Sequence, residues 1–364
     1  LSRLAIGAAF YGYGYLLGKY GFATGTDAWL TKEQKFAADN VQGAPQSYNV
    51  LIPDDDGGTD VFSYLYLAPL KGTVAIGIDD ARRDALADQL TEEQKNDAWY
   101  YSRILLNLAK DNPFNQNLKN LSDMASGIEG KQERAVQRFA SSLGISPAFI
   151  REYNRYNQDY ITDYSRGSRE LVSKNTLENI FNSTIAKEGK NFRMTALGER
   201  KQKETPTISN YFFPFGKKIG VKREPIDDVM LEDAYTHNTF TRLNSYYSEH
   251  KALKLKDFVN EDGKDLYEFY GELIREPYKN GKTLRQTLNT IIAKPSWQNL
   301  YNQPYQAIDD DGRMRNKGVE ILKDEIRKKR NLAKEDILNK RRKIANEFTD
   351  SEGKTIYDYL SEKE

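Results

Sequence analysis

Residues 4–25 read LAIGAAFYGYGYLLGKYGFATG, an apolar run in which Lys19 is the only charge. Five of its glycines fall on one face of a helix, because they are spaced by seven, four, three and four residues: Gly7, Gly14, Gly18, Gly21 and Gly25. Each interior glycine costs a helix about 1 kcal/mol relative to alanine. Glycines are nevertheless found in helices where the backbone of a second helix packs very close to the first. The stretch therefore predicts a helix packed through its glycines, in a membrane or in a tight bundle.

A second apolar stretch, residues 61–78, reads VFSYLYLAPLKGTVAIGI and could pair with the first as a hairpin. A membrane span needs about 20 mainly apolar residues, and the first stretch just reaches that length. The second is a weaker candidate because Pro69 and Lys71 interrupt it. We favour two core helices over two membrane spans.

The beginning of the chain has one feature of a secretory signal, since Arg3 precedes the apolar run. The first residue is Leu1 rather than methionine, however, and no A-x-A cleavage site follows the run. We expect residue 1 to lie inside a longer polypeptide or to follow a processing cut.

The overall composition is polar and evenly charged. The 364 residues include 54 Lys and Arg against 53 Asp and Glu, and the mean hydropathy is −0.75. Such a balance does not by itself predict a nucleic-acid or membrane partner. With 38% hydrophobic residues, a single thick core is not expected. The lack of cysteine excludes disulfides, thiolate metal sites and cysteine nucleophiles within this sequence.

Helix-start signals recur along the chain, whereas strand signals are almost absent. Thr31 with Gln34 fits a capping box, in which two side chains satisfy the free N–H groups of a first helical turn. Thr91 with Gln94 repeats the pattern and opens a long helix that ends before residue 112. Only residues 49–52 resemble a strand. We therefore predict a mainly α fold, an elongated multi-helix assembly with long irregular connections and little or no sheet.

The sequence divides into four regions. Residues 1–80 form an apolar, Gly/Tyr-rich, hairpin-like region with a polar connector, and residues 81–189 form a helical domain. Residues 190–224 form an extended aromatic strap, and residues 225–364 form a charged helical tail region. Further helices are expected at 114–125, 131–143, 148–161, 175–187, 257–274, 283–293 and 296–301, with another beginning at Pro225.

The longest helical pattern covers residues 313–348. Its apolar stripe is close to a heptad repeat: Val319, Leu322, Ile326, Ala333, Ile337, Ile344 and Phe348. Residues 313–343 include thirteen Lys or Arg but only five Asp or Glu. Two basic clusters there are candidate contacts for the phosphates of packaged DNA or of anionic lipid: Arg327, Lys328, Lys329, Arg330, Lys340, Arg341, Arg342 and Lys343. We favour a solvated face that pairs with acidic neighbours, because the whole chain is balanced in charge.

Motifs for catalysis, cofactors or metals are not found. The two histidines, His237 and His250, have no third ligand at metal spacing. The acidic runs 54–56 and 309–311 do not continue into an EF-hand, because neither has Glu at the twelfth position. No phosphate-binding loop or nucleophile elbow is present. We predict no catalytic, cofactor-binding or metal-binding residue, and no enzyme activity for this stretch.

An ordered series of short motifs extends over most of the chain. The series begins with Ala23-Thr24-Gly25 and continues with GAPQSY at 43–48, FSY at 62–64, LAPL at 67–70, NPF at 112–114, RFASSL at 138–143 and FPFG at 213–216. In this order the motifs resemble the C-terminal region of the very large internal virion proteins, and of the polyvalent proteins, of tailed bacteriophages.

This resemblance implies a protein packaged in the capsid interior near the portal and delivered into the host envelope to help form a conduit for genome ejection. Its partners would be other copies of itself, other internal virion and portal proteins, packaged DNA, and the host membrane after ejection. Some such proteins carry a peptidoglycan-cleaving domain elsewhere in a longer chain. An alternative is a soluble DNA-organising or scaffold protein of the capsid interior that uses the basic helix 313–343.

Overall fold

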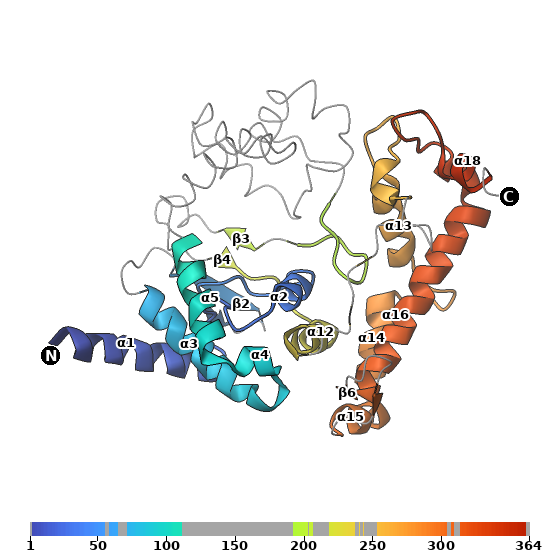
Figure 1. Ribbon diagram of the computed structural model, residues 1–364. Helices are drawn as coiled ribbons and strands as arrows, with labels where there is room; N and C mark the ends of the chain where they lie inside the picture. Colours follow the sequence, from blue (N-terminus) through green and yellow to red (C-terminus); the bar gives the residue numbers. More distant parts are fainter. Residues whose placement is uncertain are drawn as a thin grey trace.

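The computed structural model describes residues 2–54, 58–64, 71–110, 192–202, 204–206, 218–236, 240, 243, 253–303, 307–308 and 314–361. The helices expected at 114–125, 131–143, 148–161 and 175–187 lie outside the described residues. So do the two histidines, the acidic run 309–311 and the aromatic centre of the strap at 207–217. The mainly α class is confirmed: an elongated multi-helix assembly with long irregular connections and little sheet (Figure 1).

The N-terminal part of the fold holds five α-helices among its described residues. They are α1 (Ser2–Lys19), α2 (Lys32–Ala38), α3 (Lys71–Ala85), α4 (Glu92–Lys95) and α5 (Asp97–Lys110), with the 3-10 turn η1 (Ala87–Gln89) before α4. The long helix expected from Thr91 is broken at Asn96. The Asn96 side-chain oxygen accepts a hydrogen bond from the Trp99 N–H, so this residue begins a second helix.

A small antiparallel sheet lies beside these helices. Its order is β1 (Asn49–Pro53), β2 (Thr59–Ser63), β4 (Lys218–Ile219) and β3 (Thr205–Pro206). The strand expected at 49–52 is therefore confirmed. The prediction of one helical stretch over 61–78 is wrong: its first residues are strand β2, and α3 begins only at Lys71. Val61 and Phe62 are β-formers, and they lie opposite Leu51 and Val50 of β1.

The C-terminal part is a group of helices joined by turns. They are α12 (Pro225–Thr236), α13 (Leu266–Arg275), α14 (Leu284–Ile292), α15 (Pro295–Tyr301), α16 (Lys317–Glu335), α17 (Arg342–Ala345) and α18 (Ile356–Ser361). A 3-10 turn, η2 (Leu255–Asp257), precedes α13, and a two-stranded sheet, β5 (Ala307–Ile308) with β6 (Met314–Arg315), precedes α16. Figure 1 shows α16 in orange along the length of this group.

The expected heptad helix over 313–348 is interrupted. It begins at Lys317, and a π-helical turn, η3 (Asp336–Lys340), separates α16 from α17. Five stripe residues before and within this turn, from Val319 to Ile337, are buried as predicted, and so is Phe348. Ile344 is exposed instead. A π turn inserts one extra residue, so the residues after it rotate away from the original face.

The two capping boxes of the N-terminal part also connect it to the C-terminal part. Thr31 and Gln34 exchange the expected hydrogen bonds, as do Thr91 and Gln94. The Gln94 amide then donates to the Gln34 side chain and to the Trp29 carbonyl. The Gln34 amide in turn donates to the carbonyl of Tyr235 at the end of α12. Two buried glutamines thus tie α2, α4 and α12 together.

One main hydrophobic core lies among α12, α13, α14 and α16 and reaches α2 through Ala38 and Val41. Beside it, Arg285 of α14 lies between two carboxylates. Its guanidinium is 2.5 Å from a carboxylate oxygen of Glu199 and 2.5 Å from one of Asp227. The Asp227 side chain is only 1% exposed, so this ion pair joins α12 and α14 with one carboxylate fully buried, while the Arg285 side chain is 14% exposed.

We expect the substitution Arg285→Met to lower the free energy of unfolding by roughly 3–5 kcal/mol, because it leaves the buried Asp227 carboxylate without its cation. The matched control is Arg327→Met, which removes an exposed ion pair with Asp324 on α16. The control should change stability by about 1 kcal/mol or less. Urea-induced unfolding measures both values, and equal effects of the two substitutions would contradict a structural role for the Arg285 pair.

Candidate functional site

Helices α1 and α3 lie with their backbones in contact, and glycine makes this possible on both sides. A Cβ added at Gly14 would overlap the carbonyl oxygen of Val74, and one at Gly18 would lie 2.6 Å from that of Ile78. On α3, a Cβ at Gly77 would overlap the carbonyl oxygen of Tyr11. The two apolar stretches therefore pair as a hairpin through Gly14, Gly18 and Gly77.

The other three predicted glycines do not lie in this helix contact. Gly7 has nothing within 4 Å of a Cβ position. Helix α1 ends at Lys19, so Gly21 and Gly25 lie beyond it, and the prediction of one helical face through all five glycines is wrong. Gly21 has a φ of +74° and closes the helix, with the Phe22 N–H bonded to the Leu17 carbonyl, as in a Schellman motif.

The first stretch was predicted to be just long enough for a membrane span. Helix α1 ends at Lys19, however, and is 18 residues long. Within the ranges that the structure describes, no helix combines the length and the apolar character that a bilayer crossing demands.

Two tyrosines of α1 fix its register against α3. The Tyr11 hydroxyl donates to the Asp80 carboxylate at 2.8 Å, and the Tyr15 hydroxyl donates to Asp84 at 2.9 Å. Burial and the neighbouring Asp80 raise the pKa of Tyr11, which keeps the phenol as a donor. These polar contacts lie at the edges of the glycine contact, so a slip of one helix along the other would break both.

The buried carboxylate of Asp79 holds the segment that follows α1. Its oxygens accept hydrogen bonds from the Thr26 N–H at 3.0 Å, from the Thr26 hydroxyl, and from the Asp27 N–H at 3.2 Å. Gly25 lies so close that a Cβ there would overlap an Asp79 oxygen. Burial raises the pKa of Asp79 to about 7, with a further contribution from Asp27, and the three donors act in the opposite direction.

The outer side of α1 is apolar and uncovered by the described residues. Four large side chains on it are half exposed or more: Ile6 (52%), Tyr13 (59%), Leu16 (53%) and Tyr20 (65%). Their spacing of seven, three and four residues places the first three along one side of α1, and Tyr20 follows directly after the last residue of the helix. Figure 1 shows the N-terminal half of α1, in dark blue, extending beyond the rest of the fold. We call these four residues the α1 ridge.

The basic residues of the tail helices have their own contacts. Four of the eight form ion pairs: Arg327 with Asp324, Lys328 with Glu325, Lys340 with Asp336 and Arg341 with Glu276. Lys329 and Arg330 are directed inward, where they donate to the carbonyls of Glu276 and Ala196, and burial lowers the pKa of each. The Arg342 guanidinium lies 4.7 Å from the centre of the Tyr357 ring. Lys343 is exposed.

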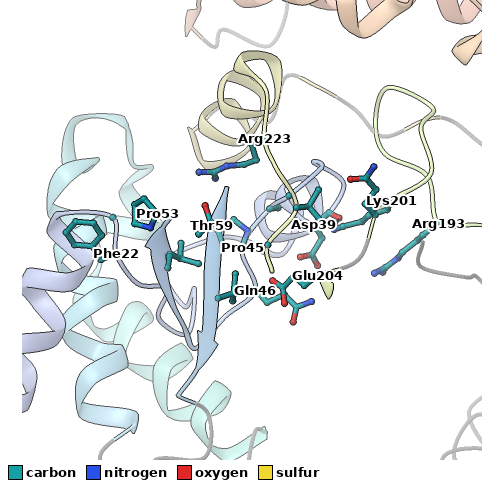
Figure 2. Close-up of a pocket in the computed structure, with 18 of the residues that line it drawn as sticks. Phe22, Asp39, Pro45, Gln46, Pro53, Thr59, Arg193, Lys201, Glu204 and Arg223 are labelled. Carbon is teal, nitrogen blue, oxygen red and sulfur yellow. Dashed lines mark hydrogen bonds between the residues drawn. The ribbon is translucent and has the colours of Figure 1, made fainter. Parts of the chain in front are cut away.

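A cavity of about 390 Å³ lies between the sheet, the end of α2 and the loop 192–202 (Figure 2). Lys201, Arg193 and Arg223 line it together with two acidic residues, Asp39 and Glu204. Two of these cations are engaged with the protein itself: Lys201 donates to the Asp39 carbonyl, and Arg223 lies 3.3 Å from Asp228. Sequence reasoning did not find this cavity, because its lining comes from separate segments with no common motif.

The described part of the chain contains no cluster of three His, Asp or Glu side chains able to hold a metal ion. Comparison with known proteins adds nothing further: no protein-family model, no curated protein and no solved structure matches this chain. The candidate site is therefore the glycine-packed hairpin with its α1 ridge, a site suited to packing against a partner.

We expect Gly14→Ala to destabilise the fold by more than 1 kcal/mol, because its methyl group overlaps the α3 backbone. Gly12→Ala is the matched control on the same helix, since nothing lies within 4 Å of its Cβ position. The control should stabilise the helix by up to about 1 kcal/mol. Thermal unfolding of both variants tests the contact, and stabilisation by both would contradict it.

We expect Asp79 to make stability fall as pH rises. Its pKa is about 7 in the folded chain and about 3.9 when unfolded, so the folded state keeps a proton that the unfolded state releases between these values. Stability should decrease across that window by at most about 1.4 kcal/mol per pH unit. Asp79→Asn removes the titration, so urea unfolding from pH 4 to 8 should show a flatter profile for the variant. Parallel profiles would contradict this assignment.

Proposed function

We propose that this chain is a non-enzymatic segment of an internal virion protein of a tailed phage, packaged near the portal and delivered into the host envelope to help form a conduit for genome ejection. The resemblance of its ordered motifs supports this proposal at the level of sequence. The structural observation that carries it is the α1 ridge, an apolar surface displayed on a helix whose opposite side is locked to α3.

The α1 ridge has the properties of an assembly surface. Large apolar side chains that stand together in water commonly mark a protein or membrane interface. The glycine contacts hold the ridge-bearing helix in place, so little conformational entropy is lost when a partner covers it. Lys19 and Arg3 are the only charges from residue 2 to residue 26. A helix that has an apolar face, and basic but no acidic residues in its sequence, suits the interfacial region of an anionic bilayer.

The partners of this proposal are other copies of the chain, other internal virion and portal proteins, and the host membrane after ejection. The α1 ridge serves the membrane contact. The tail helices would contact the phosphates of packaged DNA, through Lys343 and through the exposed basic side chains that also form ion pairs.

The alternative, a soluble DNA-organising or scaffold protein of the capsid interior, relies on the basic residues of 313–343. Their contacts favour it less, because ion pairs with Asp324 and Glu276 and the inward direction of Arg330 reduce the charge offered to phosphates. The two functions also differ in their dependence on salt, since each phosphate contact that replaces a counterion makes DNA binding more salt-sensitive.

Flotation with anionic liposomes tests the leading proposal. We expect the full chain to float, and the double variant Tyr13→Glu with Leu16→Glu to lose more than tenfold in bound fraction, because burying each of these side chains contributes roughly 1.5–3 kcal/mol. The matched control places glutamates at Ile321 and Leu332, which are exposed to a similar degree on α16. The control variant should float like the parent chain.

Two results would contradict the membrane contact: no flotation of the parent chain, or equal flotation of the α1 variant and its parent. Steeply salt-dependent DNA binding that is weakened by Arg327→Gln and Lys343→Gln, in a chain that does not float, would support the DNA-organising alternative instead.

A further inference from the structure

The C-terminal part contains an internal repeat. Residues 258–270 read FVNEDGKDLYEFY, and residues 348–360, ninety positions later, read FTDSEGKTIYDYL. The two segments share Phe, Gly, Lys and Tyr at equivalent positions, and most of the other pairs are chemically alike, such as Asn with Asp, Leu with Ile and Phe with Tyr. We call them the first and the second turn–helix unit.

The two units have the same structure, because each hydrogen bond of the first turn has an equivalent in the second. In the first, Gly263 has a φ of +80°, its N–H bonds to the Asn260 carbonyl, and the Asn260 N–H bonds to the Lys264 carbonyl. In the second, Gly353 has a φ of +77°, and Asp350 and Lys354 make the equivalent bonds.

The residue after each lysine then caps a helix. Asp265 accepts from the Glu268 N–H before α13, and Thr355 accepts from the Asp358 N–H before α18. The lysines match as well, since Lys264 lies over the ring of Phe269 and Lys354 over that of Tyr359.

The two units pair with each other through equivalent residues. The Val259 N–H donates to the Thr349 carbonyl at 2.8 Å, and the Thr349 N–H donates to the Val259 carbonyl at 3.1 Å. On either side of this bridge the rings pair reciprocally: Phe258 with Tyr359 at 6.1 Å, and Phe348 with Phe269 at 5.7 Å. Each unit thus presents the same residues to the other, as the two subunits of an isologous dimer do. Figure 1 shows α18, in red, at the same end of the helix group as α13, in gold.

A third segment shows what the pairing requires. Residues 278–284 close the same turn, with the Gly281 N–H bonded to the Tyr278 carbonyl and the Tyr278 N–H to the Lys282 carbonyl. At the position of Val259 and Thr349, however, this segment has Pro277, which has no N–H to donate. The turn alone therefore does not make a unit that can pair, and the bridging residue is the distinguishing element.

We propose that the surface of the first unit that the second unit covers is a docking site for the second unit of another copy of this chain. A self-complementary contact is satisfied equally well within one chain and between two, so an exchange replaces every contact that it breaks. The second unit is joined to α16 through the π turn η3 and the four-residue helix α17. This connection is the segment at which the chain would open for the exchange.

Because the chain has no cysteine, disulfide trapping can test the exchange directly. Val259 and Thr349 form a hydrogen-bonded antiparallel pair, whose Cα atoms are about 5.5 Å apart, within the range that a disulfide spans. One chain with Val259→Cys and another with Thr349→Cys are mixed at high concentration, approaching the roughly millimolar effective concentration of a tethered segment, and oxidised. We expect a covalent heterodimer in which mass spectrometry finds position 259 linked to position 349.

Two controls make the outcome decisive. A mixture of Pro277→Cys with Thr349→Cys places the thiol at the equivalent position of the non-pairing segment, and we expect several-fold less heterodimer from it. A single chain with both Val259→Cys and Thr349→Cys should close within itself when dilute, which shows that the substituted units still fold and pair. Closure within that chain, combined with no more heterodimer than in the Pro277 control, would overturn the proposal. Failure of the dilute chain to close would overturn the pairing itself.

Discussion

The contact between the backbones of α1 and α3 determines the position of much of the N-terminal part. Gly14, Gly18 and Gly77 let the two helices approach until main-chain atoms touch. This close approach positions α3, and α3 carries the Asp79 carboxylate that holds Thr26 and the segment around it. A side chain at any of the three glycines would separate the helices and move this carboxylate away from its donors.

From this helix pair, connections lead step by step to the rest of the molecule. The segment held by Asp79 continues into Trp29, whose carbonyl accepts from Gln94, and Gln94 donates to Gln34. Gln34 reaches the end of α12, which belongs to the main core. A mainly polar chain with modest apolar content thus has one main hydrophobic core and two smaller clusters, with a few buried polar contacts between them.

Local signals predicted a good part of this fold. The glycine spacing identified Gly14 and Gly18, the Thr31–Gln34 pair identified a capped helix, and residues 49–52 identified a strand. In each case the signal lies in a few neighbouring residues, even where the contact itself is distant in sequence, as between Gly14 and Val74. The ends of elements were less predictable: α1 stops at Lys19 because Gly21 takes a left-handed conformation, which the apolar pattern does not reveal.

Long-range features were missed for a different reason. Thr26 and Asp79 are fifty-three residues apart, and no motif next to either residue predicts their hydrogen bond. The cavity beside Lys201 draws its walls from several separate segments. The turn–helix repeat was readable in principle, but its identical residues are few and ninety positions apart, so the matching hydrogen bonds are what make it evident. The exposure of Ile344 depended on a π turn that a strict heptad cannot anticipate.

The one-sided support of α1 has a mechanical consequence. The helix contacts α3 from Tyr11 to Gly18, whereas Gly7 has nothing within 4 Å on its Cβ side. At 1.5 Å per residue, the nine residues from Tyr11 back to Ser2 form an overhang roughly 14 Å long. A tilt of about 10° at Tyr11 would displace the outer end of α1 by roughly 2 Å, so small adjustments at the glycines become larger displacements of the outermost apolar side chains.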